Sequence, residues 1–114
     1  MNLPNFLNPN EQRAIEQAVR ELVLKFPAQV RFIALFGSKA RGTARPDSDL
    51  DIVLVLREGD WRLKDAVSLP GYDLSIGTSV VPSLQVYTAT EWQQLRDWQS
   101  LFREAVERDG VSVV

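Results

Sequence analysis

Two aspartates near the middle of the chain, Asp49 and Asp51, are separated by one residue and open an apolar run. Side chains alternate along a strand, so residues two apart face the same side and the two carboxylates would lie a few Å apart. Carboxylates that close repel each other unless a cation lies between them. Mg²⁺ suits this position, because it takes oxygen ligands and usually binds one or two carboxylates together with substrate phosphates. An isolated Asp-x-Asp is more often a turn cap followed by a solvated strand residue, so the pair alone does not establish a metal site.

A glycine–serine pair, Gly37-Ser38, directly follows another apolar run and is separated from the aspartates by ten residues. Without a side chain at Gly37, the backbone N–H groups of both residues can approach phosphate oxygens. Ser38 adds a hydroxyl donor, and a short helix beginning near Lys39 would direct its positive end at the same anion. Lys39, Arg41 and Arg45 are further candidates for phosphate contact, with a solvated loop face as the alternative. The two segments together predict a site for a metal-bound nucleotide triphosphate.

The composition limits the chemistry that is open to this chain. Its 114 residues are enough for a single domain, 1–114, with one core. The net charge of −2 lacks the positive footprint of a DNA-binding protein. The absence of Cys and His excludes disulfides, thiol nucleophiles and every imidazole mechanism. No apolar run approaches the roughly 18 residues of a membrane span and no signal pattern opens the chain, so we expect a cytoplasmic protein without a membrane partner.

The hydrophobic pattern predicts the elements that must position these residues. After a loose arm over residues 1–8, Asn8 is placed to cap a helix that carries an apolar stripe and stops at Pro27. Two short, nearly continuous apolar runs follow, and both read as buried strands. These strands are Val30 to Phe36 and Leu50 to Leu56.

The second half of the chain predicts a further strand and several helical segments. Residues 60–78 read as a helical segment that is broken or kinked at Pro70-Gly71. Val80 to Tyr87 reads as a third strand. The sequence from Thr88 to Glu91 is a capping box that opens a helix, and a last helical stretch stops at Gly110. The order predicts a small α/β fold, a mixed β-sheet with helices packed on one face.

Aromatic residues are frequent among the predicted core positions. We expect most of them to pack in the interior rather than to form a base-stacking platform, with Trp61 the one most exposed. The residues concerned are Trp61, Trp92, Trp98, Phe32, Phe36 and Phe102.

Two segments, Phe36 to Gly42 and Ser48 to Asp51, resemble the signature of the polymerase-beta-like nucleotidyltransferase superfamily. The resemblance holds in order, in spacing and in the apolar strands that flank both segments. It is closest to the minimal nucleotidyltransferases, short bacterial and archaeal proteins that consist of the catalytic core alone. The stretches Ala89 to Trp92 and Arg103 to Val111 are also like the ends of such proteins.

The resemblance implies transfer of a nucleoside monophosphate, usually AMP from ATP, to an acceptor hydroxyl with release of pyrophosphate. Asp49 and Asp51 would be the catalytic residues and would hold Mg²⁺, with two ions possible. The nucleotide would be bound by Gly37, Ser38, Lys39, Arg41 and Ser48.

The chain departs from the family at one position. Active members usually carry a third carboxylate on a neighbouring strand, where it helps to bind metal and can accept the acceptor's proton. The corresponding strand, Val80 to Tyr87, contains no Asp or Glu. Gln85 lies about where that residue is expected but cannot act as a base at neutral pH. Asp73 is the nearest acidic alternative, although it precedes the strand.

The minimal nucleotidyltransferases commonly occur as partners of HEPN-domain proteins in toxin–antitoxin pairs, in which they resemble antitoxins that adenylylate the toxin. The resemblance therefore implies an antitoxin that transfers AMP to a hydroxyl of a HEPN-domain partner. The missing carboxylate favours an alternative, a weak or inactive domain that neutralises its partner by binding alone. A third reading, an enzyme that modifies small molecules, would normally need a further domain to hold its substrate.

Overall fold

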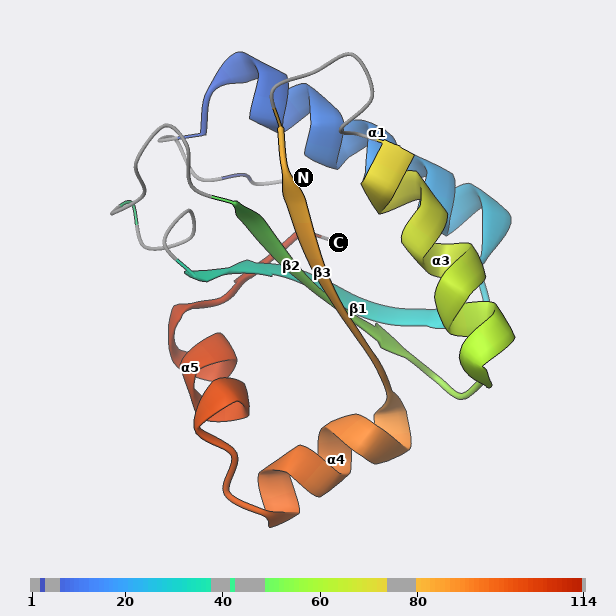
Figure 1. The fold of residues 1–114 in the computed structure, drawn as a ribbon, viewed down its shortest axis with the longest axis vertical. Helices are drawn as coiled ribbons and strands as arrows, with labels where there is room; N and C mark the ends of the chain where they lie inside the picture. Colours follow the sequence, from blue (N-terminus) through green and yellow to red (C-terminus); the bar gives the residue numbers. More distant parts are fainter. Residues whose placement is uncertain (1–2, 4–6, 38–41, 43–48, 74–79, 114) are drawn as a thin grey trace.

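The computed structural model describes residue 3, residues 7–37, residue 42, residues 49–73 and residues 80–113, without the side chains of 71–73. Figure 1 shows its elements in chain order. They are α1 (Pro9–Lys25), β1 (Val30–Phe36), β2 (Leu50–Leu56), α3 (Trp61–Asp73), β3 (Pro82–Thr88), α4 (Ala89–Asp97), α5 (Leu101–Asp109) and β4 (Val111–Ser112).

The strands form one four-stranded sheet in the order β3-β2-β1-β4. Strand β1 is antiparallel to β2 and to β4, whereas β2 and β3 are parallel. The mixed α/β class is therefore confirmed, and β1 and β2 have the predicted bounds. Strand β4 was not predicted, because two residues are too few to show a period.

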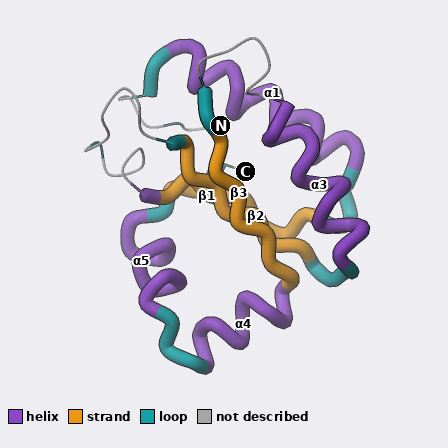
Figure 2. Tube along the Cα trace, in the orientation of Figure 1, coloured by secondary structure: helices purple, strands orange, loops and turns teal. Residues whose placement is uncertain are grey.

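Helices cover both faces of the sheet rather than the single face that we expected. On one face, α1 and α3 pack on Leu50, Ile52 and Leu54 of β2. On the other face, Val53 packs with residues of β1 and α5. Figures 1 and 2 show α1 and α3 on one side of the sheet and α4 and α5 on the other. The physical reason lies in β2 itself, since a strand that is apolar at both alternating sets of positions must be buried on both faces.

Helix α1 begins at the predicted capping box. The backbone N–H of Glu11 donates to Asn8 Oδ1 over 2.8 Å, and the backbone N–H of Asn8 donates to Glu11 Oε1 over 3.0 Å. Pro9 takes the first helical position, where its missing N–H costs no hydrogen bond. None of the helices among the described residues is long and apolar enough to cross a membrane.

Helix α3 continues through Pro70 as far as Asp73, so of the break or kink that we expected there, the break does not occur. Asp60 caps its start, since Asp60 Oδ1 accepts from the backbone N–H groups of Arg62 and Leu63. Pro70 lies in the last turn and a half, so its ring removes one hydrogen bond late in the helix. Pro70 and Val67, three residues apart, are both buried, and this burial offsets the lost bond. Residues 74–78 of the predicted segment lie outside the described residues.

An aromatic cluster fixes α4 and α5 against the sheet. Phe102 is its centre, with ring centroids 5.3 Å from Phe36, 5.9 Å from Tyr87 and 6.3 Å from Trp92. Phe32 belongs to the same cluster through Trp92, since the centroids of these two rings are 6.2 Å apart. The expectation of interior packing is thus confirmed for these rings. Trp61 is 66% exposed, as expected, whereas Trp98 is 72% exposed, contrary to the expectation of interior packing.

The capping box of α4 is linked to α3 by an ion pair. Thr88 Oγ1 accepts from the backbone N–H of Glu91, and Glu91 Oε1 accepts from that of Thr88. Lys64 Nζ of α3 lies 2.6 Å from the same Glu91 oxygen. The hydrogen bond from Lys64, followed by that from the Thr88 backbone, lowers the pKa of Glu91. Helices from opposite faces are thereby joined around one edge of the sheet.

Replacing Phe102 by alanine should lower the free energy of unfolding by about 2–3 kcal/mol, because three ring contacts are lost from a half-buried position. Urea unfolding followed by circular dichroism measures the change. Leu101→Ala is the matched control, since Leu101 is 81% exposed and its truncation should change stability by less than about 0.5 kcal/mol. Equal losses in the two variants would contradict the role given to the cluster.

Glu91→Gln should destabilise the protein at pH 7 by about 0.5–1 kcal/mol, because the amide keeps the cap but loses the ion pair with Lys64. Since the folded-state pKa of Glu91 is lowered, its contribution is complete above the unfolded pKa of about 4.3 and is lost as the pH falls through the folded value. The stability difference between wild type and variant should therefore shrink below about pH 4. Unfolding curves from pH 3 to 7 test this, with Glu16→Gln as an exposed control; a difference independent of pH would refute it.

Candidate active site

The glycine after β1 packs directly on one of the two aspartates. Phe36, the last residue of β1, is paired with Asp51 of β2. Gly37 follows with a φ of +73°, a left-handed conformation that favours glycine. A Cβ built at Gly37 would lie 2.3 Å from Asp51 Oδ2. Glycine is therefore required here both for the backbone turn and for the room that the carboxylate occupies.

This second requirement was missed by the sequence reasoning, which assigned Gly37 only to the approach of phosphate. The strand register carries the signal, because antiparallel pairing of two seven-residue strands brings the residue after β1 beside the start of β2. The register itself is not visible in the spacing of Gly37 and Asp51, since the loop between them leaves it open.

The two aspartates lie at the point where the chain enters the central strand. Asp49 is exposed and stands one residue before β2, whereas Asp51 is half-buried within it. Asp51 alternates with Leu50 and Ile52, which face α1 and α3, so it shares the opposite face with Val53. Asp49, two residues earlier, is expected on that same side. Asp51 thus lies beside Gly37, at the end of the face that α4 and α5 cover.

Four of the predicted nucleotide-binding residues lie outside the described part of the chain. Their roles stay predictions. These residues are Ser38, Lys39, Arg41 and Ser48.

The neighbouring strand brings no carboxylate to the aspartates. In the parallel pairing of β2 and β3, Ser83 lies opposite Asp51 and Gln85 opposite Val53. Gln85 is exposed and shares the face of Asp51 one pair further along. Asp73 ends α3, a helix that packs on the other face of the sheet. Within the described ranges, no group of three or more His, Cys, Asp or Glu side chains is placed to hold a metal ion.

Part of this chain is similar in sequence to a known protein. The protein named "Putative protein adenylyltransferase MJ0604" of Methanocaldococcus jannaschii is 44% identical over 46 residues, which are 40% of this chain and 46% of that protein. The match thus spans less than half of the length of this relative.

Two solved structures share the fold. A "putative nucleotidyltransferase" from Sulfolobus solfataricus matches with a TM-score of 0.51 and 21% identity, over 88% of this chain and 76% of that one. A chain from the structure of a toxin–antitoxin with AMP-PNP matches with a TM-score of 0.56 and 18% identity, over 87% of this chain and 72% of that one.

A family model assigns most of the chain. The model describes a nucleotidyltransferase domain, and it matches residues 13–105. This range includes most of α1, the three long strands, Gly37 and both aspartates. The chain therefore belongs to the nucleotidyltransferase domain family.

Proposed function

We propose that this chain is a Mg²⁺-dependent adenylyltransferase that moves AMP from ATP to a hydroxyl of a HEPN-domain partner, as the cytoplasmic antitoxin of a toxin–antitoxin pair. The observation that carries the proposal is the contact between Gly37 and Asp51, at the end of the central strand of a nucleotidyltransferase domain. The relative named as a protein adenylyltransferase and the structural neighbour from a toxin–antitoxin with AMP-PNP support the choice of reaction and of partner.

The donor set fits Mg²⁺. Asp49 and Asp51 offer hard oxygen ligands at the open end of a strand, and triphosphate oxygens would complete the coordination. When bound, Mg²⁺ neutralises the triphosphate and lowers the pKa of the acceptor hydroxyl. Because Gly37 has no Cβ, the Asp51 carboxylate is not displaced from this position.

In the proposed reaction, the acceptor oxygen forms a bond to the α-phosphorus of ATP. The bond from that phosphorus to the bridging oxygen of the β-phosphate breaks, and pyrophosphate leaves with the electron pair. Gly37 and Ser38 would hold the β- and γ-phosphates through their N–H groups, with Lys39, Arg41 and Ser48 as further contacts. The acceptor's proton goes to Asp51 or to solvent, because β3 presents Ser83 and Gln85 on this face and neither is a base at neutral pH.

A domain that binds its partner without transferring AMP is the second candidate function. The specific observation in its favour is the same pair of β3 residues, Ser83 and Gln85, in the region where active members usually carry a third carboxylate. Two carboxylates and the triphosphate suffice to hold one Mg²⁺ ion, so nucleotide binding would persist in that case.

The transfer is tested by incubating the purified protein with α-labelled ATP, Mg²⁺ and the HEPN-domain protein encoded beside it. We expect label on the partner, and its reduction to background by EDTA or by the double variant Asp49→Asn, Asp51→Asn, because both changes remove the metal. Asp65→Asn, an exposed aspartate of α3, is the control and should label the partner as the wild type does. A stable complex without label would overturn the enzyme and support the binding module.

Gly37→Ala should reduce transfer at least about a hundredfold, since a misplaced catalytic group costs about that much. The added Cβ would displace Asp51 Oδ2, and alanine at a φ of +73° adds strain of about 1–2 kcal/mol. Gly59→Ala is the matched control, because a Cβ there would meet Leu63 Cδ2 at 2.4 Å, in the turn between β2 and α3. Both variants should melt at lower temperature, but only Gly37→Ala should lose transfer per folded molecule. Similar rates in the two variants would remove Gly37 from the site.

A further inference from the structure

A cavity of about 530 Å³ lies on the α4 and α5 face, at the end of β1 opposite to Gly37. None of the residues that line it is Gly37, Asp49 or Asp51, so it is separate from the candidate active site. Its polar lining is Arg31, Gln93, Arg96, Arg103, Glu107 and Ser112. The lining contains three guanidinium groups and one carboxylate, so it carries an excess of positive charge, although the chain as a whole has a net charge of −2.

Arg31 reaches this face through an irregularity in β1. Val30 is paired with Leu56 and Phe32 with Val55, so one extra residue, Arg31, is inserted into the strand. Val30 packs with the core under α1, whereas Phe32 packs with the cluster under α4. A bulge of this kind re-aims a side chain, and Arg31 consequently lines the cavity beside Phe32.

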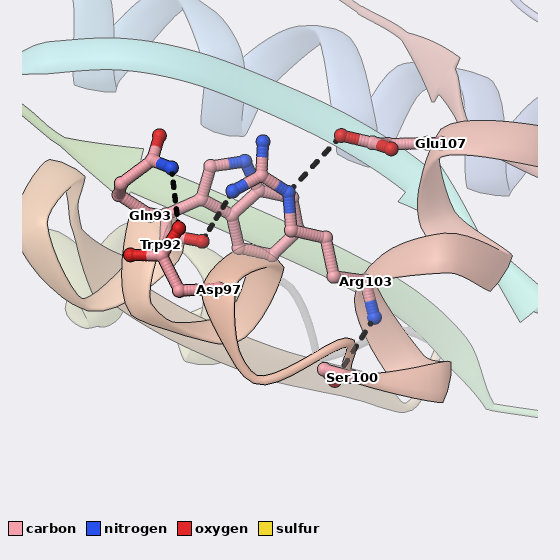
Figure 3. A network of polar contacts seen from close by, with 6 residues as sticks. All are labelled: Trp92, Gln93, Asp97, Ser100, Arg103 and Glu107. Carbon is pink, nitrogen blue, oxygen red and sulfur yellow. Dashed lines mark hydrogen bonds and ion pairs between the residues drawn. The ribbon is translucent and has the colours of Figure 1, made fainter.

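Arg103 is the fixed element of the cavity. The residue is only 8% exposed, and its Nε donates to Glu107 Oε1 over 3.0 Å. Its Nη1 donates to the carbonyl oxygen of Trp92, and the guanidinium carbon lies 4.8 Å from the centroid of the Trp92 ring. Figure 3 shows two guanidinium nitrogens in these bonds and the third without a dashed line. Nη2 thus has no hydrogen-bond partner among the described residues and remains available for an anion.

The surroundings of the cavity favour a protein segment over a nucleotide. Arg103 lies over one face of the Trp92 ring, and the rings of Phe32, Tyr87 and Phe102 pack against the same ring, so less of it is left for a base to stack on. Trp98, in the turn after α4, and Leu101, the first residue of α5, are 72% and 81% exposed and lie in the sequence between Arg96 and Arg103. Two exposed apolar side chains thus lie between two arginines of the cavity lining, which suits a segment with acidic and apolar residues.

We propose that this cavity, with Arg31, Arg96 and Arg103, is a docking pocket for an acidic side chain of the partner protein. The inference rests on the proposed function only in that a protein partner exists. It needs neither ATP nor Mg²⁺. Arg103, held by Glu107 and Trp92, forms the floor of the pocket. The exposed Arg31 and Arg96 attract and orient the carboxylate.

The probe for the test is a fluorescein-labelled hexaglutamate peptide, titrated at low ionic strength and followed by fluorescence anisotropy. We expect binding to the wild type and a loss of at least about tenfold in affinity in the double variant Arg31→Glu, Arg96→Glu, because two attractive charges become repulsive. Arg13→Glu, Arg20→Glu makes the same change of net charge at exposed arginines of α1, on the opposite face of the sheet, and should weaken binding less than threefold. Circular dichroism melting verifies that both variants fold.

Three results would overturn the proposal: no binding of the peptide to the wild type, an equal loss in the control double variant, or complete displacement of the peptide by an equimolar amount of inorganic phosphate or ATP. The last result would identify a small-anion site instead. The active-site variant Asp49→Asn, Asp51→Asn should bind the peptide as the wild type does. Peptide binding without AMP transfer would therefore contradict only the proposed reaction. AMP transfer without peptide binding would contradict only the proposed pocket.

Discussion

The burial of strand β2 on both of its faces is the constraint on which the rest of the structure depends. Five consecutive residues, 52–56, are buried, and the strand is paired on each side by β1 and β3. No charged group can occupy that interior without a large desolvation cost. Carboxylates are consequently tolerated only where the chain enters the strand, and Asp49 and Asp51 stand there. The position of the candidate chemistry is thus a consequence of the core.

The same constraint requires two helical layers, and the chain builds them from local signals. Capping boxes at Asn8 and Thr88 start a helix on each face. The link between Lys64 and Glu91 then ties the layers at one edge. Apolar burial supplies most of the stabilisation of such an arrangement, whereas the ion pair and the caps fix where each helix begins. The aromatic cluster around Phe102 holds α5 near Phe36, the residue before Gly37, so the second layer supports the turn of the candidate site.

Much of the fold could be predicted because its signals are local. The bounds of β1 and β2 follow from their apolar runs, and both capping boxes follow from four-residue motifs. The features that could not be predicted depend on contacts between distant segments. The tolerance of Pro70 depends on burial beside Val67, and the coverage of both faces depends on how α4 and α5 return to the sheet. For the site, the sequence predicted Gly37 and the two aspartates, but their mutual contact depends on strand register. The insertion of Arg31 into β1 is likewise invisible in the sequence, since it exists only relative to β2.

Strand β1 has the candidate active site after its last residue and the arginine-lined cavity at its start. Gly37 is six residue steps along the chain from Arg31, or roughly 20 Å at the rise of an extended chain. In the proposed reaction, a partner held at the cavity would carry its acceptor hydroxyl about one strand length from its acidic anchor. The fixed length of β1 would then select among the hydroxyls of the partner by their distance from that anchor, without any contact that reads the acceptor residue itself.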